Sequence, residues 1–174
     1  MKTKLTIANI KYLQDKQWLL DSEIMKAKNI NLSEWINSYQ ANHNIAMKLE
    51  IAEFVNECRD IWKYWKQQAV DRKKLLNEAI DVVHFVFLNL NKIHTSLEGK
   101  FAEIEGYTES ANRYIGDTVK VHHLEQLVSE DYNTYYVLGF VLVILDRYGF
   151  TTKDIIDEYN EKNKENFSRL ESGY

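Results

Sequence analysis

The stretch that decides the fold class of this chain is LLNEAIDVVHFVFLNL, from Leu75 to Leu90. In a helix with this sequence, apolar residues point in nearly every direction, so other helices must cover it on most sides. The exceptions near its start are Glu78 and Asp81, which lie three positions apart and therefore on one face. Burying an ionised carboxylate without a partner is costly, so this acidic pair needs an explanation.

The composition also favours a helical protein. The 174 residues include no proline and only six glycines. Long helices can therefore continue uninterrupted, whereas sheet-rich folds usually need more turn residues. The length fits one domain with a sizeable core, over residues 1–174. We predict an all-α bundle of four or five main helices.

Apolar spacing and capping residues predict where the helices lie. Asn31 and Thr151 each precede an acidic residue by three positions, as in a capping box, and Gly149 is expected to cap the helix before it. Three glycines interrupt residues 98–120, where we predict a loop with short helical pieces, and we expect a mobile polar tail at 168–174. The helices are expected over residues 7–25, 34–39, 44–66, 72–93, 122–129, 131–148 and 151–166.

Charge and cysteine content exclude several classes of protein. A net charge of −4 argues against a basic nucleic-acid surface, and Cys58, the single cysteine, leaves no internal disulfide. The first 14 residues lack the apolar core of a signal peptide. Residues 135–145 are far fewer than the ~20 apolar residues that span a bilayer, and we expect them to form core and to be a candidate dimer interface. We therefore expect a soluble cytoplasmic protein with neither nucleic-acid nor membrane partners.

A second acidic pair, Glu50 and Glu53, lies on a stripe of the 44–66 helix that is otherwise apolar. Two neighbouring helices could bring these carboxylates to Glu78 and Asp81. Four clustered negative charges repel one another unless cations compensate them. Hard divalent ions bind through oxygen, and Mg²⁺ also accepts substrate phosphate oxygens. The pattern therefore predicts a magnesium site that can polarise a phosphoryl group and activate water.

Two other interpretations fit the acidic pattern alone. Glutamates three apart on a helix are common on solvated faces, so salt bridges to Lys48, Arg59 or Lys63 in a non-enzymatic helical binding protein remain open. A di-iron bundle usually needs Glu-x-x-His on two helices, and Asp81-x-x-His84 is a single imperfect match. For Glu57, a supporting or structural role is at least as reasonable as a catalytic one.

E-x-x-E at Glu50 is followed by an aromatic tract, IWKYWK at 61–66, and then by E-x-x-D at Glu78, continued by Val-Val-His-Phe85. This order of motifs resembles the dimeric dUTPase family, a branch of the all-α NTP pyrophosphatases. The resemblance spans nearly the whole chain and is weakest between residues 95 and 129. The other matching residues are Gln17 with Asp21, and Tyr159, Lys162, Asn163, Asn166, Arg169 and Tyr174 near the C-terminus. Mild departures from the family pattern are Trp62, Val83 and Leu170.

The resemblance implies a reaction and a biological setting. The reaction is hydrolysis of dUTP to dUMP and pyrophosphate, with water attacking the α-phosphorus; whether dUDP is also accepted stays open. Glu50, Glu53, Glu78 and Asp81 would hold Mg²⁺, and Glu50 or Glu53 would orient or deprotonate the water. The protein would be a homodimer. Abundant Asn, Lys, Ile and Tyr indicate an AT-rich genome, such as that of a bacterium or a phage.

The resemblance also implies a substrate site. Phe85 and Trp62 would sandwich uracil, Gln17 would hydrogen-bond the base edge, and His84 would contact the sugar; without the resemblance, core packing is the commoner role of such aromatic residues. A related enzyme that cleaves dCTP, or one of MazG type, is the nearest alternative. The remaining substrate-binding residues are Asp21, Trp65, Tyr159, Asn163 and Tyr174, with Lys63, Lys162, Asn166 and Arg169 for the triphosphate.

Overall fold

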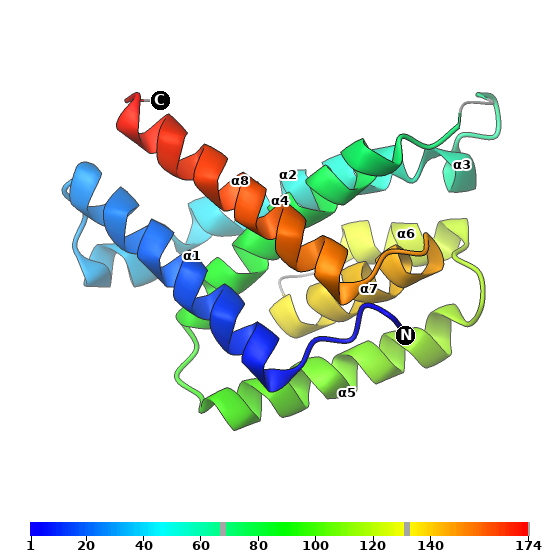
Figure 1. The fold of residues 1–174 in the computed structure, drawn as a ribbon, viewed down its shortest axis with the longest axis horizontal. Coiled ribbons are helices and arrows are strands. Elements are labelled where there is room, and N and C mark those ends of the chain that lie inside the picture. Colours follow the sequence, from blue (N-terminus) through cyan, green and yellow to red (C-terminus); the bar gives the residue numbers. More distant parts are fainter. Residues whose placement is uncertain (67–68, 131–132, 174) are drawn as a thin grey trace.

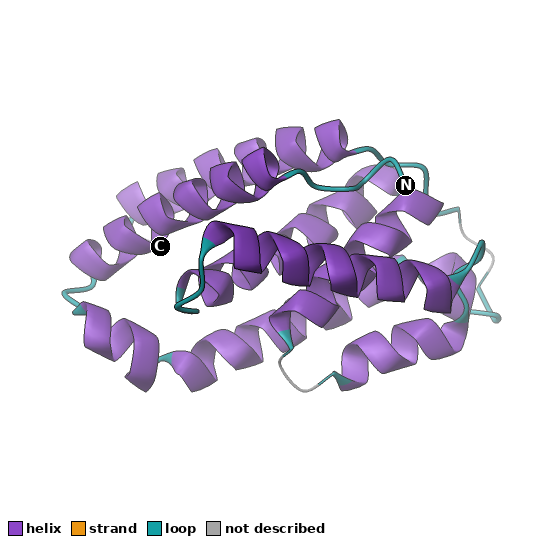
Figure 2. Ribbon diagram, turned by 90° about the horizontal axis from the view of Figure 1, so that it is seen from below, coloured by secondary structure: helices purple, strands orange, loops and turns teal. Residues whose placement is uncertain are grey.

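The computed structural model describes residues 1–66, 69–130 and 133–173. These residues form helices and no strand, which confirms the prediction of an all-α protein (Figure 2). The elements are α1 (Ile7–Ala27), the π-helix η1 (Glu34–Ser38), α2 (Gln40–Glu57), α3 (Arg59–Trp62), α4 (Arg72–Asn91), α5 (Leu97–Ile115), α6 (Val121–Ser129), α7 (Thr134–Arg147) and α8 (Thr152–Glu171).

Helix α4 is the centre of the bundle. It packs against α1, α2, α7 and α8 (Figure 1). Val82, Val83, Val86 and Phe87 are fully buried there. The apolar stretch from Leu75 to Leu90 is therefore covered on most sides, as its sequence predicts.

The loop predicted at residues 98–120 is wrong over 98–115, because α5 is continuous from Leu97 to Ile115, and only residues 116–120 are non-helical. Ser96 caps this helix by accepting a hydrogen bond from the backbone N–H of Gly99 at 3.1 Å. Glycine inside a helix costs about 1 kcal/mol relative to alanine. Burial of one face of α5 against the core outweighs that cost, and Gly116, at φ +63°, follows the last residue of the helix.

Helices α5 and α7 approach closely at Gly139. A Cβ atom at this position would lie 2.9 Å from the backbone carbonyl carbon and oxygen of Tyr107. Only a residue without a side chain fits between the two helices at this distance. The contact explains why a glycine interrupts the otherwise apolar α7.

The helix predicted over 44–66 differs from the structure at both ends. Helix α2 begins at Gln40 and ends at Glu57, because Cys58 leaves the helical conformation with ψ at 38°. The short α3 follows, so the aromatic tract at 61–66 begins on α3 and continues in the segment after it, rather than lying on α2. The chain direction therefore changes between the E-x-x-E motif and this tract.

The C-terminal helix is longer than predicted. Thr151 and Asp154 form the predicted capping box, and Gly149, at φ +81°, follows α7 as expected. Helix α8 continues to Glu171 instead of ending at 166, so most of the predicted polar tail is helical. Of the helix predicted over 131–148, the first two residues lie outside the described ranges.

Helix α7 is core, as predicted. Residues 137–145 are all buried within the single chain, where α4 and α5 cover them. Of the stretch expected as a candidate dimer interface, Tyr135 and Tyr136 are half-buried, and the interface stays a prediction. None of the described helices is both long and apolar enough to cross a bilayer.

Candidate active site

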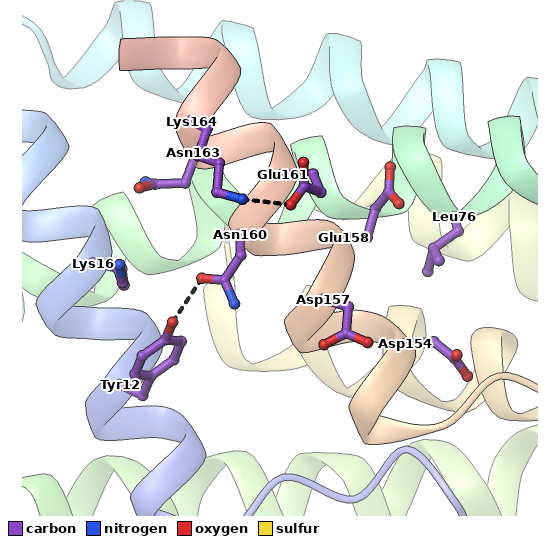
Figure 3. Close-up of a pocket in the computed structure, with 10 residues that line it drawn as sticks. All are labelled: Tyr12, Lys16, Leu76, Asp154, Asp157, Glu158, Asn160, Glu161, Asn163 and Lys164. Carbon is purple, nitrogen blue, oxygen red and sulfur yellow. Dashed lines mark hydrogen bonds and ion pairs between the residues drawn. The ribbon is translucent and has the colours of Figure 1, made fainter. Parts of the chain in front are cut away.

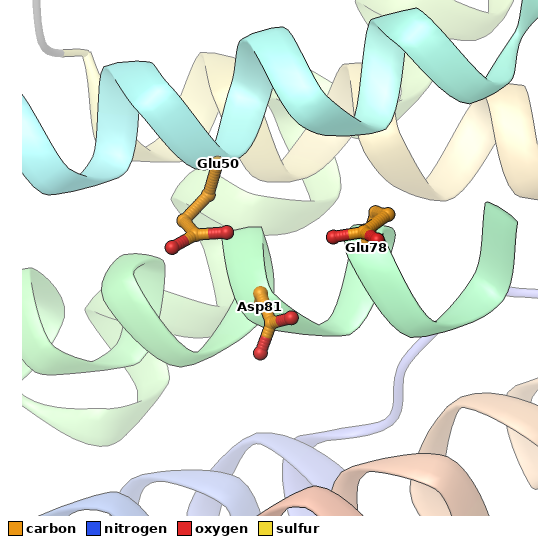
Figure 4. A group of neighbouring side chains, drawn as sticks. All are labelled: Glu50, Glu78 and Asp81. Carbon is orange, nitrogen blue, oxygen red and sulfur yellow. The ribbon is translucent and has the colours of Figure 1, made fainter. Parts of the chain in front are cut away.

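Three carboxylates from two helices converge on one point. Glu50 projects from α2, while Glu78 and Asp81 project from α4, one turn apart (Figure 4). One oxygen from each carboxylate lies within 4.8 Å of the others. The E-x-x-E and E-x-x-D motifs therefore meet because α2 and α4 pack side by side.

The ionised forms of these three carboxylates are energetically unfavourable at this position. Burial, and then the charges of Asp81, Glu53 and Glu78, raise the pKa of Glu50 to about 7. Burial also raises the pKa of Glu78 and of Asp81, the latter in spite of a nearby lysine. A divalent cation would relieve both the repulsion and the lost hydration, so the donor set fits such an ion.

The other two glutamates of α2 differ from Glu50. Glu53 is exposed at the rim of the same pocket and is not part of the converging group. Glu57 is 1% exposed and forms ion pairs with Arg59 and, at 3.0 Å, with Lys74. Burial favours its neutral form, but hydrogen bonds from Lys74 and Arg59 together keep the pKa of Glu57 below its usual value. Glu57 therefore links the end of α2 to the start of α4.

The three carboxylates form part of the wall of a pocket of about 610 Å³. Near them, α8 contributes Lys162, Asn166 and Arg169, and Lys162 Nζ lies 2.5 Å from Asp81 Oδ2. An apolar part of the wall comes from α1, η1 and α4, through Leu20, Ile24, Trp35, Phe85 and Leu88. The pocket thus combines a charged region with an apolar region.

Four buried polar residues form a hydrogen-bonded group beside the apolar region. Gln17 Oε1 lies 2.8 Å from both the Tyr159 hydroxyl and His84 Nδ1. Gln17 Nε2 donates to Asp21 Oδ1 at 2.8 Å. The rings of His84 and Tyr159 stack with centroids 3.9 Å apart. Burial lowers the pKa of His84 to about 3, so its imidazole is neutral.

A family model described as dUTPase matches residues 9–174, and this range includes every element of the pocket. The chain belongs to the all-α dUTPase family. Its activity is accordingly that of a dUTP diphosphatase, in a family that is generally metal-dependent. A comparison with curated proteins finds no significant match.

The structure of this dUTPase brings together many of the residues selected from the sequence. Tyr159 lies directly behind the wall, bonded to Gln17. Tyr174 lies outside the described residues. The predicted substrate-binding residues in the pocket wall are Gln17, Asp21, His84, Phe85, Lys162, Asn166 and Arg169.

Asn163 faces a different pocket of the dUTPase, of about 550 Å³, between α1 and α8 (Figure 3). Four acidic residues of α8 line it, and the Tyr12 hydroxyl bonds to Asn160 Oδ1 at 2.7 Å across the two helices. Asn163 is buried, and its Nδ2 atom has no hydrogen-bond partner among the described residues. This second pocket contains none of the converging carboxylates.

The aromatic tract of the dUTPase does not contribute to the carboxylate pocket within this chain. The Trp62 indole N–H donates to the Val55 carbonyl at 3.0 Å, and Lys63 Nζ donates to Asn56 Oδ1 at 2.7 Å. Trp65 is 63% exposed. None of these three residues is part of the wall, so the proposed stacking of Trp62 on uracil stays a prediction.

Sequence reasoning missed Trp35, His43 and Asn77, which also line the carboxylate pocket of the dUTPase. Trp35 is 5% exposed and packs with Leu88 and Met25. Its signal in the sequence is a single large aromatic residue in the polar segment NLSEWINS. That signal indicates a buried aromatic residue, but it does not show that Trp35 lines a pocket.

Proposed function

We propose that the chain hydrolyses dUTP to dUMP and pyrophosphate with Mg²⁺, by attack of water on the α-phosphorus. The observation that carries this proposal is the convergence of Glu50, Glu78 and Asp81 in a pocket that also contains Lys162 and Arg169. Acidic metal ligands beside cationic side chains suit a substrate with a triphosphate.

Glu50, Glu78 and Asp81 would hold the metal, with Glu53 at the rim as a further ligand. The raised pKa values of the three converging carboxyls support this assignment, since burial, and for Glu50 and Glu78 also the neighbouring carboxylates, make their ionised forms costly without a cation. When bound, Mg²⁺ supplies charge neutralisation for phosphate oxygens and lowers the pKa of a coordinated water.

Glu50 is the group that we propose to orient the attacking water and to accept its proton. Its carboxylate belongs to the converging group, so it would lie beside a water held by the same metal. Lys162 and Arg169 would donate charge-assisted hydrogen bonds to the phosphates. The apolar region, with Phe85 and Trp35, would receive the base and exclude water from it.

We also propose a homodimer in the cytoplasm of a bacterium or of a phage-infected cell. The family resemblance supports the dimer, and the abundance of Asn, Lys, Ile and Tyr supports an AT-rich genome. Light scattering on the purified chain tests the dimer, which requires twice the 20.6 kDa of one chain. A single-chain mass at micromolar concentration would refute it.

A substrate panel with Mg²⁺ tests the activity. dUTP should be cleaved much faster than dCTP or dTTP, with release of pyrophosphate. In ¹⁸O-labelled water the label should enter dUMP, because water attacks the α-phosphorus. Equal cleavage of dCTP would instead identify a related pyrophosphatase, and label in pyrophosphate would refute the point of attack.

Matched variants test the metal site. Glu78→Gln should abolish hydrolysis and weaken Mg²⁺ binding. The control is Glu161→Gln, an exposed carboxylate of the second pocket that pairs with Lys164 (Figure 3). If Glu78→Gln retains its Mg²⁺ affinity, the carboxylates are structural and the proposal fails.

A further inference from the structure

Gln17 has both ends of its amide engaged inside the protein. Its Oε1 atom is the partner of the Tyr159 hydroxyl and of His84 Nδ1, and its Nε2 atom donates to Asp21. Gln17 is only 3% exposed. Its amide is therefore poorly placed to read a base edge directly, although the residue lines the pocket.

The charge of Asp21 determines which way the Gln17 amide points. A carboxylate can only accept hydrogen bonds, so the amide nitrogen faces Asp21 and the amide oxygen faces His84. Burial raises the pKa of Asp21 to about 7, so the carboxylate predominates above that pH. Since the amide oxygen is an acceptor, Nδ1 of the neutral His84 must carry the proton. Nε2 of His84 then retains its lone pair.

Two buried acceptors beside Gln17 are left without partners. Asp21 Oδ2 and His84 Nε2 have no hydrogen bond among the described residues. Asp21 is 0% exposed and His84 5%, and both residues line the pocket next to Phe85. Buried polar atoms are normally satisfied, so unpartnered ones in a cavity wall point to a ligand that donates hydrogen bonds.

We infer that Tyr159 and Gln17 are positioning residues that hold His84 in its Nδ1-protonated tautomer, so that His84 Nε2 and Asp21 Oδ2 are the acceptors offered to the N3–H of the substrate base. This inference deepens the proposed function and rests on it for the identity of the substrate. It assigns the reading of the base to His84 and Asp21 rather than to the amide of Gln17.

The inference has a chemical consequence for specificity. Uracil carries an N–H donor at N3, whereas the N3 of cytosine is an acceptor. Acceptors that face N3 therefore favour dUTP over dCTP, because cytosine turns a lone pair toward them at this position and carries its N–H donors on the neighbouring 4-amino group. Thymine shares the N3–H of uracil, so this group cannot distinguish dUTP from dTTP.

Tyr159→Phe tests the inference, because it removes the hydroxyl and keeps the ring that stacks on His84. We expect the ratio of kcat/KM for dUTP to that for dCTP to fall about 3- to 10-fold at pH 8, as for the loss of one hydrogen bond. The ratio for dUTP to dTTP should stay within about twofold.

Tyr12→Phe is the matched control, since it also removes a hydroxyl that bridges α1 and α8, at 2.7 Å from Asn160 (Figure 3). It should change neither ratio. If Tyr159→Phe and Tyr12→Phe give the same dUTP-to-dCTP ratio, the inference is wrong.

A second readout does not depend on hydrolysis. In ¹⁵N NMR spectra of the imidazole groups, His84 of the unmodified chain should have a protonated Nδ1 and an unprotonated Nε2. Tyr159→Phe should shift His84 toward a mixture of tautomers, and Tyr12→Phe should not. A protonated Nε2 in the unmodified chain would overturn the inference, whereas failure to cleave dUTP would overturn only the proposed function.

Discussion

Lys162 of α8 and Asp81 of α4 form a largely buried ion pair, with Nζ 2.5 Å from Oδ2. The pair connects the C-terminal helix to the acidic cluster. A cation bound to Asp81 would share or replace this lysine, and the released ammonium group would be available to a phosphate. The ion pair therefore links metal binding to substrate binding. Removing Lys162 should change the two in opposite directions.

Lys162→Met should separate these effects, because methionine keeps the aliphatic volume and removes the charge. Without nucleotide, Mg²⁺ affinity should rise, since the cluster loses its nearest cation. kcat/KM for dUTP should fall about 10- to 100-fold, the loss expected for a hydrogen bond to a charged group. Calorimetric Mg²⁺ titration and steady-state kinetics measure the two quantities.

Lys164→Met is the control for this experiment, because Lys164 is exposed on the same helix and pairs with Glu161. It should leave both quantities unchanged. A decrease in Mg²⁺ affinity for Lys162→Met would contradict the competition between Lys162 and the metal.

Glu50→Gln should make the metal-free protein more stable than the unmodified chain at high pH. The pKa of Glu50 is about 7 in the folded protein, against an ordinary value of 4.5 for a glutamate. The folded state therefore binds more protons between these values, so stability falls as pH rises through this window, and the penalty is complete above pH 7. Solvent screening reduces this penalty on the half-buried carboxylate. Removing the penalty with Glu50→Gln should therefore raise the melting temperature by about 2–4 °C at pH 8 and by little at pH 5.

Thermal unfolding of both proteins in EDTA at these two pH values measures this difference. Contributions from buried histidines cancel, because both proteins contain them. Mg²⁺ should narrow the gap by stabilising the unmodified chain. A gap that is the same at pH 5 and pH 8 would mean that Glu50 has an ordinary pKa.

Trp35, rather than Trp62, should report nucleotide binding by its fluorescence. Trp35 lines the pocket, whereas Trp62 is bonded to the Val55 carbonyl outside it. The fluorescence change on adding dUMP should be lost in Trp35→Phe and retained in Trp62→Phe. The opposite result would support the stacking of Trp62 on uracil that the family resemblance implies. Trp18→Phe, on the exposed face of α1, controls for a general loss of signal.

Gly139→Ala should destabilise the protein, because the new Cβ would lie 2.9 Å from the backbone of Tyr107. Forcing α5 and α7 apart should cost about 1–3 kcal/mol. Gly106→Ala is the matched control, since a Cβ atom at that position would meet nothing within 4 Å beyond the nearby backbone of its own helix, and alanine is the better helix former. Chemical denaturation should show opposite signs for the two variants, and a stabilising Gly139→Ala would contradict the close approach.

Local features of the sequence predicted much of the fold. The all-round apolar pattern of 75–90 identified the central helix, and Thr151, Asp154 and Gly149 act as caps as predicted. The prediction failed at 98–115 and after Glu57. In the first case, burial of one face of α5 outweighed the cost of its glycines. In the second, Cys58 is fully buried in a non-helical conformation that no local signal revealed.

The sequence by itself determined that the chain is helical and that two helices carry acidic pairs, because helical periodicity places residues three or four apart on one face. Only the tertiary structure decided that Glu50 joins Glu78 and Asp81, while Glu57 turns to Arg59 and Lys74. It also decided that Trp35 lines the pocket and Trp62 does not. The physical reason is that the register and crossing angle of two helices depend on all the side chains packed between them, which no pattern within one helix contains.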